Sequence, residues 1–322
     1  MAANSGPKSF HDIVRSHRGF LVNPLQWTLR HLDLVGCRFA DVETTPVYAE
    51  STDNDRFCSK APSDAEVIAL NLFPKIKRRR LINILVGKER TFAYHSKGAP
   101  FYFQGRPIHR PDYTVFHRHE EPVDHIHNGS PPLVGYVHYT SVNGDRRRQF
   151  EPCPGPMGAN NSVGASICQK RLARITPNEW TEDPYFLCLL LALAQLQERK
   201  LDLSKSTTYT SRLLVTNVLD RQYILYCEAE FTTELLNGLR NPTLATSPLK
   251  WPTIRRKKLP YKPYNSFADR LIAELLAPAP LPDHNSPLNP AFDMNCVIEH
   301  NRKRPHEQED SRSHKTRRFG KS

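Results

Sequence analysis

The sequence predicts a mixed α/β or α+β domain with a single mixed central sheet, a buried helix packed on that sheet and a disordered C-terminal tail. Three observations support this prediction. The richest apolar run, FLCLLLALAQL at 186–196, lies inside a longer helical pattern. Runs rich in β-branched and aromatic residues, which favour strands, precede and follow it at 133–142 and 211–231. From residue 278 the chain is Pro-rich and then highly charged, a composition that does not form a packed core.

The overall composition fits a globular protein. The 322 residues, of which 39% are hydrophobic, are enough for one large domain or two modest ones. No apolar run reaches the roughly 18 residues that a membrane-spanning helix needs, so we expect no membrane partner. Seven scattered cysteines without a CxxC pair favour a reducing compartment over a disulfide framework or a zinc ribbon.

The chain divides into three predicted parts. We expect an N-terminal extension over 1–62, an α/β core domain over 63–277 and the tail over 278–322. The first part mixes short apolar runs with a long polar stretch, which indicates one small element followed by a loop.

The first half of the core domain is predicted to contain one helix and several strands. Ser63 or Asp64 caps a helix over 65–78, whose apolar residues recur at helical spacing. Two strand-like runs follow within 80–96, and 113–116 is the end of another strand. The clearest strand is LVGYVHYTSV at 133–142, and the Pro, Gly and Asn residues of 151–165 indicate a loop.

The second half of the core domain has a more regular pattern. A long buried helix begins near Pro184, with Thr181 or Asp183 as its cap. Two strands then surround a turn at 219–222, and Pro242 ends a short helix. The remaining elements are an extended basic and aromatic segment over 250–267 and an amphipathic helix capped by Ser266.

Two acidic residues lie at distinct positions in the first half of the core domain. Glu66 lies in the first helix within SDAEVIALNLFP, and Asp112 follows a proline at a predicted strand end in RPDYTVF. With the helix over 185–199 and the strand pair after it, this order resembles the PD-(D/E)XK nuclease-like fold, which includes the restriction endonucleases. The resemblance implies that Glu66 and Asp112 hold Mg²⁺, which activates water and offsets phosphate charge.

The chain departs from that family on the next strand. In that family this strand carries an acidic residue and a lysine two positions apart, the acidic-x-Lys triplet. Here the strand reads GYVHYTSV, with Tyr136 and His138 at the triplet positions. An active enzyme would therefore need an atypical catalytic site made of Glu66, Asp112 and His138. A degenerate domain would keep Glu66 and Asp112 as remnants of metal ligation.

Two further polar groups have a functional and a structural interpretation. A histidine-rich stretch lies within residues 106–129. Alternate side chains of a strand project from the same side, so two of its imidazoles could share one metal ion. The alternative is that the stretch is a solvent-exposed loop. Its candidate ligands are His117, His119, Asp124, His125 and His127. Asp220, Glu228 and Glu230 on the late hairpin could perform acid/base chemistry, or they could form the exposed face of an edge strand.

Basic clusters predict a polyanionic partner. Lys and Arg number 45 against 33 Asp and Glu, a net charge of +12. We expect DNA or RNA to contact Arg78, Arg79, Arg80, Arg255, Arg256, Lys257 and Lys258. Around the second cluster, aromatic residues could stack on bases or could pack back on the core. These residues are Trp251, Tyr261, Tyr264 and Phe267.

The tail contains two basic groups about ten residues apart. This spacing resembles a bipartite nuclear-import signal, which implies an import receptor as partner and a nuclear location. The residues concerned are Lys303, Arg304, Lys315, Arg317 and Arg318. A basic tail that holds polyanions non-specifically is the alternative. The C-terminal half also resembles lineage-restricted fungal proteins that share a pattern like SRLLVTN..D..YILYCEAEF.

Three functional hypotheses follow. The first is a nuclear protein whose degenerate nuclease-like domain binds nucleic acid or a nuclear partner. The second is an active Mg²⁺-dependent phosphodiesterase, and the third is a protein-interaction module with no role on nucleic acid.

Overall fold

The computed structural model describes residues 8–17, 21–42, 62–86, 91–118, 133–200 and 208–278. Met1–Ala279 form one compact unit, and all of these residues belong to it. The second unit, Pro280–Ser322, lies outside the described residues together with the predicted import signal.

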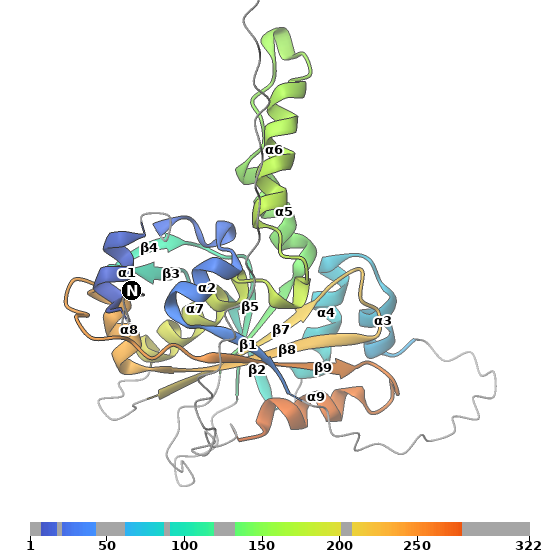
Figure 1. The fold of residues 1–322 in the computed structure, drawn as a ribbon. Coiled ribbons are helices and arrows are strands. Elements are labelled where there is room, and N and C mark those ends of the chain that lie inside the picture. Colours follow the sequence, from blue (N-terminus) through green and yellow to red (C-terminus); the bar gives the residue numbers. More distant parts are fainter. Residues whose placement is uncertain are drawn as a thin grey trace, which may run out of the picture. The chain divides into compact units, whose positions relative to one another are not determined.

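A mixed sheet of seven strands is the centre of the compact unit (Figure 1). Two neighbouring pairs, β1–β9 and β6–β7, run parallel, and the other pairs are antiparallel. In sheet order the strands are β1 (Arg38–Asp41), β9 (Thr253–Pro260), β8 (Tyr223–Thr232), β7 (Thr208–Thr216), β6 (Leu133–His138), β5 (Thr114–Arg118) and β2 (Phe92–Lys97). A separate hairpin consists of β3 (Phe101–Phe103) and β4 (Arg106–His109). The predicted fold class, α/β with a single mixed central sheet, is confirmed.

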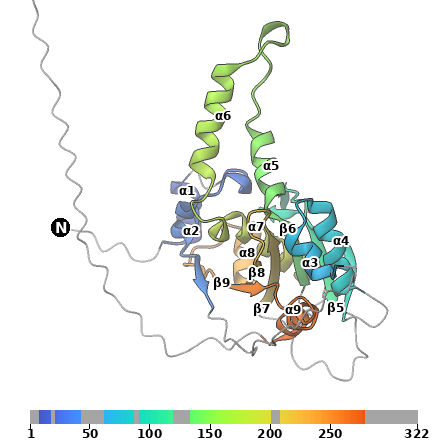
Figure 2. The ribbon, with the colours of Figure 1, turned by 90° about the vertical axis from the view of Figure 1, so that its right-hand side faces the viewer.

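Helices cover both faces of this sheet (Figures 1 and 2). The helices are α1 (Phe10–Ser16), α2 (Leu29–Val35), α3 (Asp64–Leu70), α4 (Pro74–Leu85), α5 (Tyr139–Gln149), α6 (Ser162–Ile175), α7 (Tyr185–Lys200), α8 (Thr233–Arg240) and α9 (Phe267–Leu276). Short 3-10 turns occur at Pro24–Gln26, Pro156–Gly158 and Trp180–Glu182. None of the helices in the described part of the chain has the length and apolar character needed to cross a membrane.

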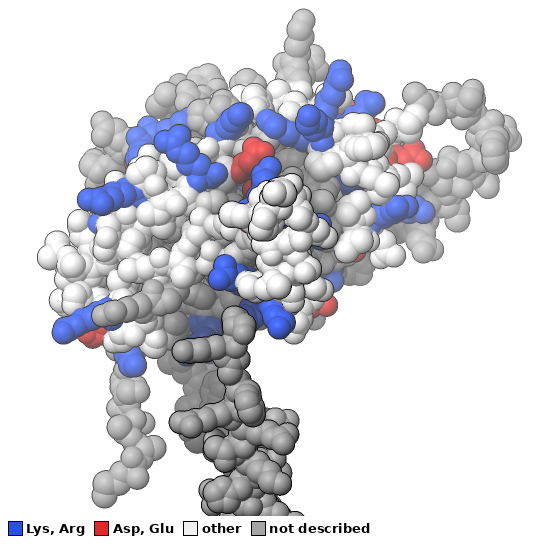
Figure 3. All heavy atoms as spheres, turned by 90° about the horizontal axis from the view of Figure 1, so that it is seen from above, with Lys and Arg blue, Asp and Glu red and all other residues white. Residues whose placement is uncertain are grey.

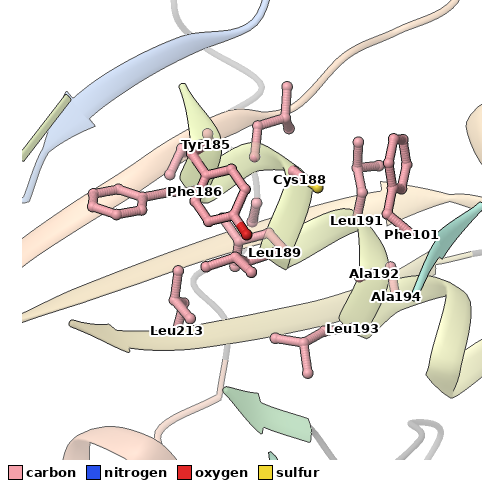
Figure 4. Close-up of a cluster of buried hydrophobic side chains, with 14 of the residues drawn as sticks. Phe101, Tyr185, Phe186, Cys188, Leu189, Leu191, Ala192, Leu193, Ala194 and Leu213 are labelled. Carbon is pink, nitrogen blue, oxygen red and sulfur yellow. The ribbon is translucent and has the colours of Figure 1, made fainter. Parts of the chain in front are cut away.

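The predicted buried helix is α7, and it forms the core on one face of the sheet. Its residues from Tyr185 to Ala194 are all buried, because the segment is apolar around its whole circumference. Figure 4 shows Leu193 directed toward Leu213 of β7, and Leu191 beside Phe101 of β3. Asp183 caps the helix as predicted, since its Oδ1 accepts a hydrogen bond from the Tyr185 amide at 2.9 Å.

The opposite face of the sheet is covered by α3, α4 and α9. Alternate strand residues supply this second core, so that Phe116 and Leu214 lie here while their neighbours Val115 and Leu213 face α7. Ser63 caps α3, because its side chain accepts a hydrogen bond from the Glu66 amide. The predicted cap Ser266 precedes α9 but makes no side-chain capping bond.

Four predicted element boundaries are wrong. The single helix predicted over 65–78 is divided into α3 and α4, because the chain turns at 71–73 and Pro74 begins the second helix. Residues 80–85 continue helix α4 instead of starting a strand, because Leu81, Ile84 and Leu85 form a buried helical face. The strand predicted over 133–142 ends at His138, whose side chain caps α5. The loop predicted over 151–165 ends early, since Asn161 caps α6.

The described residues before position 43 share the core of the domain. Strand β1 is an edge strand of the main sheet, paired in parallel with β9. Phe10, Trp27 and Leu32 belong to the same buried cluster as α7. This part of the segment assigned to an N-terminal extension is therefore a component of the folded unit.

The pair α5–α6 projects away from the sheet, as both ribbon views show (Figures 1 and 2). Helix α6 has no buried residue along its 14 positions. We call residues 139–175, from the start of α5 to the end of α6, the arm.

Candidate functional site

The first candidate site is the edge of the sheet where the parallel strands β6 and β7 both end. His138 is the last residue of β6 and lies opposite Thr216, the last residue of β7. The hydroxyl groups of Tyr136 and Thr216 are hydrogen-bonded at 2.9 Å. The carboxyl ends of parallel strands are a common position for ligand sites in α/β sheets.

His138 has one satisfied and one unsatisfied ring nitrogen at this edge. Its Nδ1 accepts a hydrogen bond from the Thr140 amide at 3.2 Å, so the neutral ring carries its proton on Nε2. That nitrogen is buried without a hydrogen-bond partner among the described residues. Burial, together with the positive charge of Lys77, lowers the pKa of His138 to about 4. The imidazole is therefore neutral near pH 7.

Lys77 of α4 brings a buried positive charge close to this edge. The side chain is fully buried, and its Nζ donates to the Ile68 carbonyl oxygen at 2.6 Å. Burial and the charge of Arg221 lower the pKa of Lys77 to about 8. Lys77 therefore adds positive charge near His138, whereas a metal site would need carboxylates.

Of the three predicted catalytic residues, His138 lies at this edge. Thr114, the first residue of β5, is opposite Tyr136 of β6, and Asp112 comes two residues before β5, outside this strand pairing. Asp112 is exposed. Glu66 lies on α3 beside Tyr264, whose pKa is raised by burial and by the Glu66 carboxylate.

No larger cluster of metal ligands surrounds the three predicted catalytic residues within the described part of the chain. Within the described ranges, no hydrogen bond or ion pair joins Glu66 to Asp112 or His138. Across those same ranges, no three His, Cys, Asp or Glu side chains gather closely enough to hold a metal ion. The roles of Glu66, Asp112 and His138 stay predictions.

The acidic residues of the late hairpin have structural partners. Strand β8 lies between β7 and β9, so the prediction that its acids lie on an edge strand is wrong. Glu228 is buried and bonded to Arg212, Arg255 and Tyr226. Asp220 accepts hydrogen bonds from Trp180 Nε1 at 2.7 Å and from Tyr223 Oη at 2.9 Å. These contacts hold the sheet and its turn together.

The histidine-rich stretch falls largely outside the described residues. His117 lies on β5 opposite Ala93 of β2. The other candidate ligands lie outside the described ranges, and they are His119, Asp124, His125 and His127.

The basic cluster 255–258 is mostly engaged within the domain. Arg256 is 7% exposed, and its guanidinium contacts Asp41, Glu182 and Thr181. Arg255 pairs with Glu228 at 2.6 Å, and Lys257 pairs with Glu274 at 2.6 Å. Lys258 is exposed. Most of the basic side chains in this cluster therefore form ion pairs that hold β9 against neighbouring elements.

The aromatic residues around this cluster pack into the fold. Trp251, Tyr261 and Phe267 are buried, and Tyr264 is half-buried. Of the two interpretations of this segment, the structure supports packing against the core, because buried rings cannot stack on bases.

The cluster 78–80 is engaged in part. Arg78 donates to the Tyr94 hydroxyl at 2.9 Å, and Arg80 pairs with Asp64 at 2.9 Å. Arg79 is exposed and forms no ion pair within the described part of the chain. Its predicted contact with nucleic acid stays a prediction.

The second candidate site is a basic surface on the arm that the sequence analysis missed. Helix α6 presents five exposed residues at the spacing of one helical face. These are Val163, Ile167, Lys170, Arg171 and Arg174. The half-buried residues Gly164, Cys168, Leu172 and Ile175 form the adjacent stripe. The signal that was missed is the spacing of these residues at three or four positions, which is typical of one helical face. Part of this pattern lies in a segment that was predicted to be a loop.

Two arginines of α5 extend this surface. The Arg171 guanidinium lies over the Phe150 ring at 5.9 Å, which places it next to the end of α5 and its exposed Arg147 and Arg148. Arg148 pairs with Asp145. Arg147, Lys170, Arg171 and Arg174 form no ion pair within the ranges that the structure describes. We call these four residues the arm cations.

The face from which the arm projects is rich in positive charge. Figure 3 views the domain from this side, and Lys and Arg clearly outnumber Asp and Glu among the residues drawn in colour. A negatively charged polymer would therefore meet attractive charge around the arm as well as on it.

Comparisons of the chain with protein-family models, with curated proteins and with solved structures found no match. The nuclease-like resemblance is therefore carried by Glu66, Asp112 and the order of the elements alone.

Proposed function

We propose that this protein binds nucleic acid without cleaving it, and that the arm cations supply the main phosphate contacts of its folded domain. The observation that carries the proposal is the group of unpaired cations on a helix pair that projects from the sheet. The two basic groups of the tail would serve as a nuclear-import signal.

The physical reason is that free cations on a projecting helix can replace the counterions of a phosphate backbone. Each Lys or Arg that neutralises a phosphate releases condensed ions, and this release favours binding. An α-helix fits the major groove of duplex DNA, and the 14 residues of α6 extend over about 21 Å. By contrast, Arg255, Arg256 and Lys257 already have carboxylate partners within the domain.

The polar edge of the sheet supports binding more than catalysis. His138 is neutral and enclosed, and the nearby buried charge on Lys77 is positive. Two-carboxylate metal chemistry would require Glu66 and Asp112 to face one ion. The described residues contain no group of three or more His, Cys, Asp or Glu side chains that could complete such a site.

The test is fluorescence anisotropy with a labelled duplex DNA and a labelled single-stranded RNA. The full-length protein and a variant lacking 301–322 are each compared with and without the substitutions Arg147→Gln, Lys170→Gln, Arg171→Gln and Arg174→Gln. We expect the arm substitutions to weaken binding by at least about tenfold in both backgrounds.

A control with the same loss of charge separates the arm from general electrostatics. It carries Lys75→Gln, Arg106→Gln, Lys250→Gln and Lys262→Gln, four exposed residues outside the arm that are not among the predicted nucleic-acid contacts. Equal weakening by both sets, or binding that disappears entirely with 301–322, would contradict the proposal. A parallel set with Mg²⁺ is scored for cleavage, and a product abolished by Asp112→Ala would favour the phosphodiesterase.

A further inference from the structure

Large apolar side chains are exposed together at the turn between α3 and α4. Leu70, Leu72, Phe73 and Ile76 are 49%, 52%, 66% and 36% exposed. We call these four residues the α3–α4 knuckle. They lie within seven consecutive positions, unlike the isolated exposed leucines Leu219 and Leu244. A contiguous apolar surface of this kind is typical of an interaction site.

The exposure of the knuckle is fixed by the backbone of the turn. The Asn71 side chain accepts a hydrogen bond from the Phe73 amide at 2.8 Å, and the Asn71 amide donates to the Val67 carbonyl at 3.0 Å. Pro74 then begins α4, and the Phe73 carbonyl accepts the Lys77 amide at 3.1 Å. The apolar residues that α3 and α4 need for packing lie on their opposite faces. The turn therefore holds the side chains of the knuckle at the surface, where a partner protein can contact them.

Positive charge lies directly beside the knuckle. Lys75 and Arg79 are exposed on α4 and form no ion pair with any residue that the structure describes. Their neighbours Arg78 and Arg80 are bonded to Tyr94 and Asp64. The N-terminus of α4 adds the positive end of a helix dipole. Apolar and cationic groups thus alternate over one short surface.

We propose that the α3–α4 knuckle docks an acidic amphipathic helix of a partner protein. Apolar side chains of that helix would contact Leu72 and Phe73, and carboxylates on its flanks would face Lys75 and Arg79. This interaction is independent of nucleic-acid binding by the arm.

The charge and side-chain types of the knuckle favour an acidic helix over a membrane surface and over nucleic-acid bases. A polybasic membrane-binding segment usually contains about four to eight cations, and the knuckle has two that are free. Aliphatic side chains such as Leu72 and Ile76 offer no ring on which a base can stack. An acidic helix satisfies both parts of the surface, because it buries the apolar side chains and pairs the two cations.

The test uses two synthetic helical peptides with identical Leu and Phe positions, one with Glu and one with Lys at the flanking positions. Binding to the full-length protein is measured by calorimetry. We expect the Glu peptide to bind at least about tenfold more tightly than the Lys peptide. Leu72→Ala with Phe73→Ala should weaken the Glu peptide at least about tenfold. Lys75→Glu with Arg79→Glu should reverse the preference between the two peptides.

The matched control is Leu219→Ala with Leu244→Ala, which removes two exposed leucines from other places and should leave peptide binding unchanged. Thermal unfolding confirms that each variant is folded. Absence of binding by both peptides, equal binding of both, or equal loss in the control would overturn the proposal. So would co-sedimentation with phosphatidylserine vesicles that depends on Phe73 in the absence of peptide binding, because that result would assign the knuckle to a membrane surface.

Discussion

Arg146 and Asp183 form a two-point ion pair that is completely enclosed by the domain. Arg146 Nη1 lies 2.5 Å from Asp183 Oδ2, Nη2 lies 2.6 Å from Oδ1, and neither side chain is exposed. The Tyr139 hydroxyl donates to the same carboxylate at 2.8 Å, and Arg146 Nε donates to the Leu25 carbonyl at 2.9 Å. The pair joins the base of the arm on α5 to the start of the buried helix α7.

Removing one partner of this pair should destabilise the whole domain. Asp183→Ala leaves the Arg146 charge buried without a counter-charge, and we expect a loss of about 3–5 kcal/mol in the free energy of unfolding. Urea denaturation measures this loss. The control is Asp145→Ala, which removes the partner of the largely exposed Arg148 and should cost less than about 1 kcal/mol. Similar losses for the two variants would contradict the structural role of Asp183.

Two glycines of the domain should respond to alanine in opposite directions. A Cβ at Gly98 would overlap the ring of the buried Tyr113, so Gly98→Ala should cost about 1–3 kcal/mol. A Cβ at Gly144, within α5, would meet no atom within 4 Å, so Gly144→Ala should stabilise the helix by about 0.5–1 kcal/mol. Thermal unfolding of both variants gives the signs, and destabilisation by Gly144→Ala would show that α5 is not helical there.

Acid should weaken the domain through Glu228. Burial opposes ionisation of this carboxyl, but the hydrogen bonds from Arg212 and Tyr226 and the charges of Arg212 and Arg255 outweigh it and hold the pKa of Glu228 below its usual value. The stabilisation is therefore complete above the unfolded pKa of about 4.3 and is lost as the pH falls through the lower folded pKa. In urea denaturation, Glu228→Gln should be less stable than wild type at pH 7. This difference should shrink as the pH approaches about 3, and a constant difference would contradict the ion pair.

His138 should also oppose protonation in the folded state. Its pKa is lowered to about 4 from 6.5, so stability is lost as the pH falls from the unfolded value toward the folded one. The shift corresponds to at most about 3.5 kcal/mol. NMR titration of the ring should show no protonation until the pH is below about 5, and titration near 6.5 would contradict the burial of Nε2. His138→Asn, which keeps a capping side chain for α5, should flatten the stability profile between pH 4 and 6.5.

Strongly patterned elements of this fold were predictable from the sequence. Helix α7 and the strand pair β7–β8 have long apolar or alternating runs, and both appear where the sequence places them. The arm was not predictable in this way, because α6 packs no buried residue and α5 buries only Tyr139, Val142 and Arg146. Elements with little burial leave only a weak periodic signal.

The candidate site could be predicted less completely than the fold. The clusters of basic residues at 78–80 and 255–258 do not reveal in the sequence which side chains form ion pairs. In the structure, acidic side chains pair with Arg80, Arg255, Arg256 and Lys257. The arm cations are spread along two segments that only the turn after α5 brings together. His138 and Thr216 are brought together at one edge through strand pairing, which no local motif records.

The most direct test of nucleic-acid binding by the arm is the salt dependence of duplex DNA affinity in the variant lacking 301–322. For a duplex, the slope of log affinity against log salt falls by about 0.9 for each phosphate contact that is removed. We expect the four glutamine substitutions at the arm cations to reduce the magnitude of the slope by about three to four, and the control with equal charge loss to reduce it by less than about one. An unchanged slope in the arm variant would contradict the claim that the arm holds the phosphate backbone.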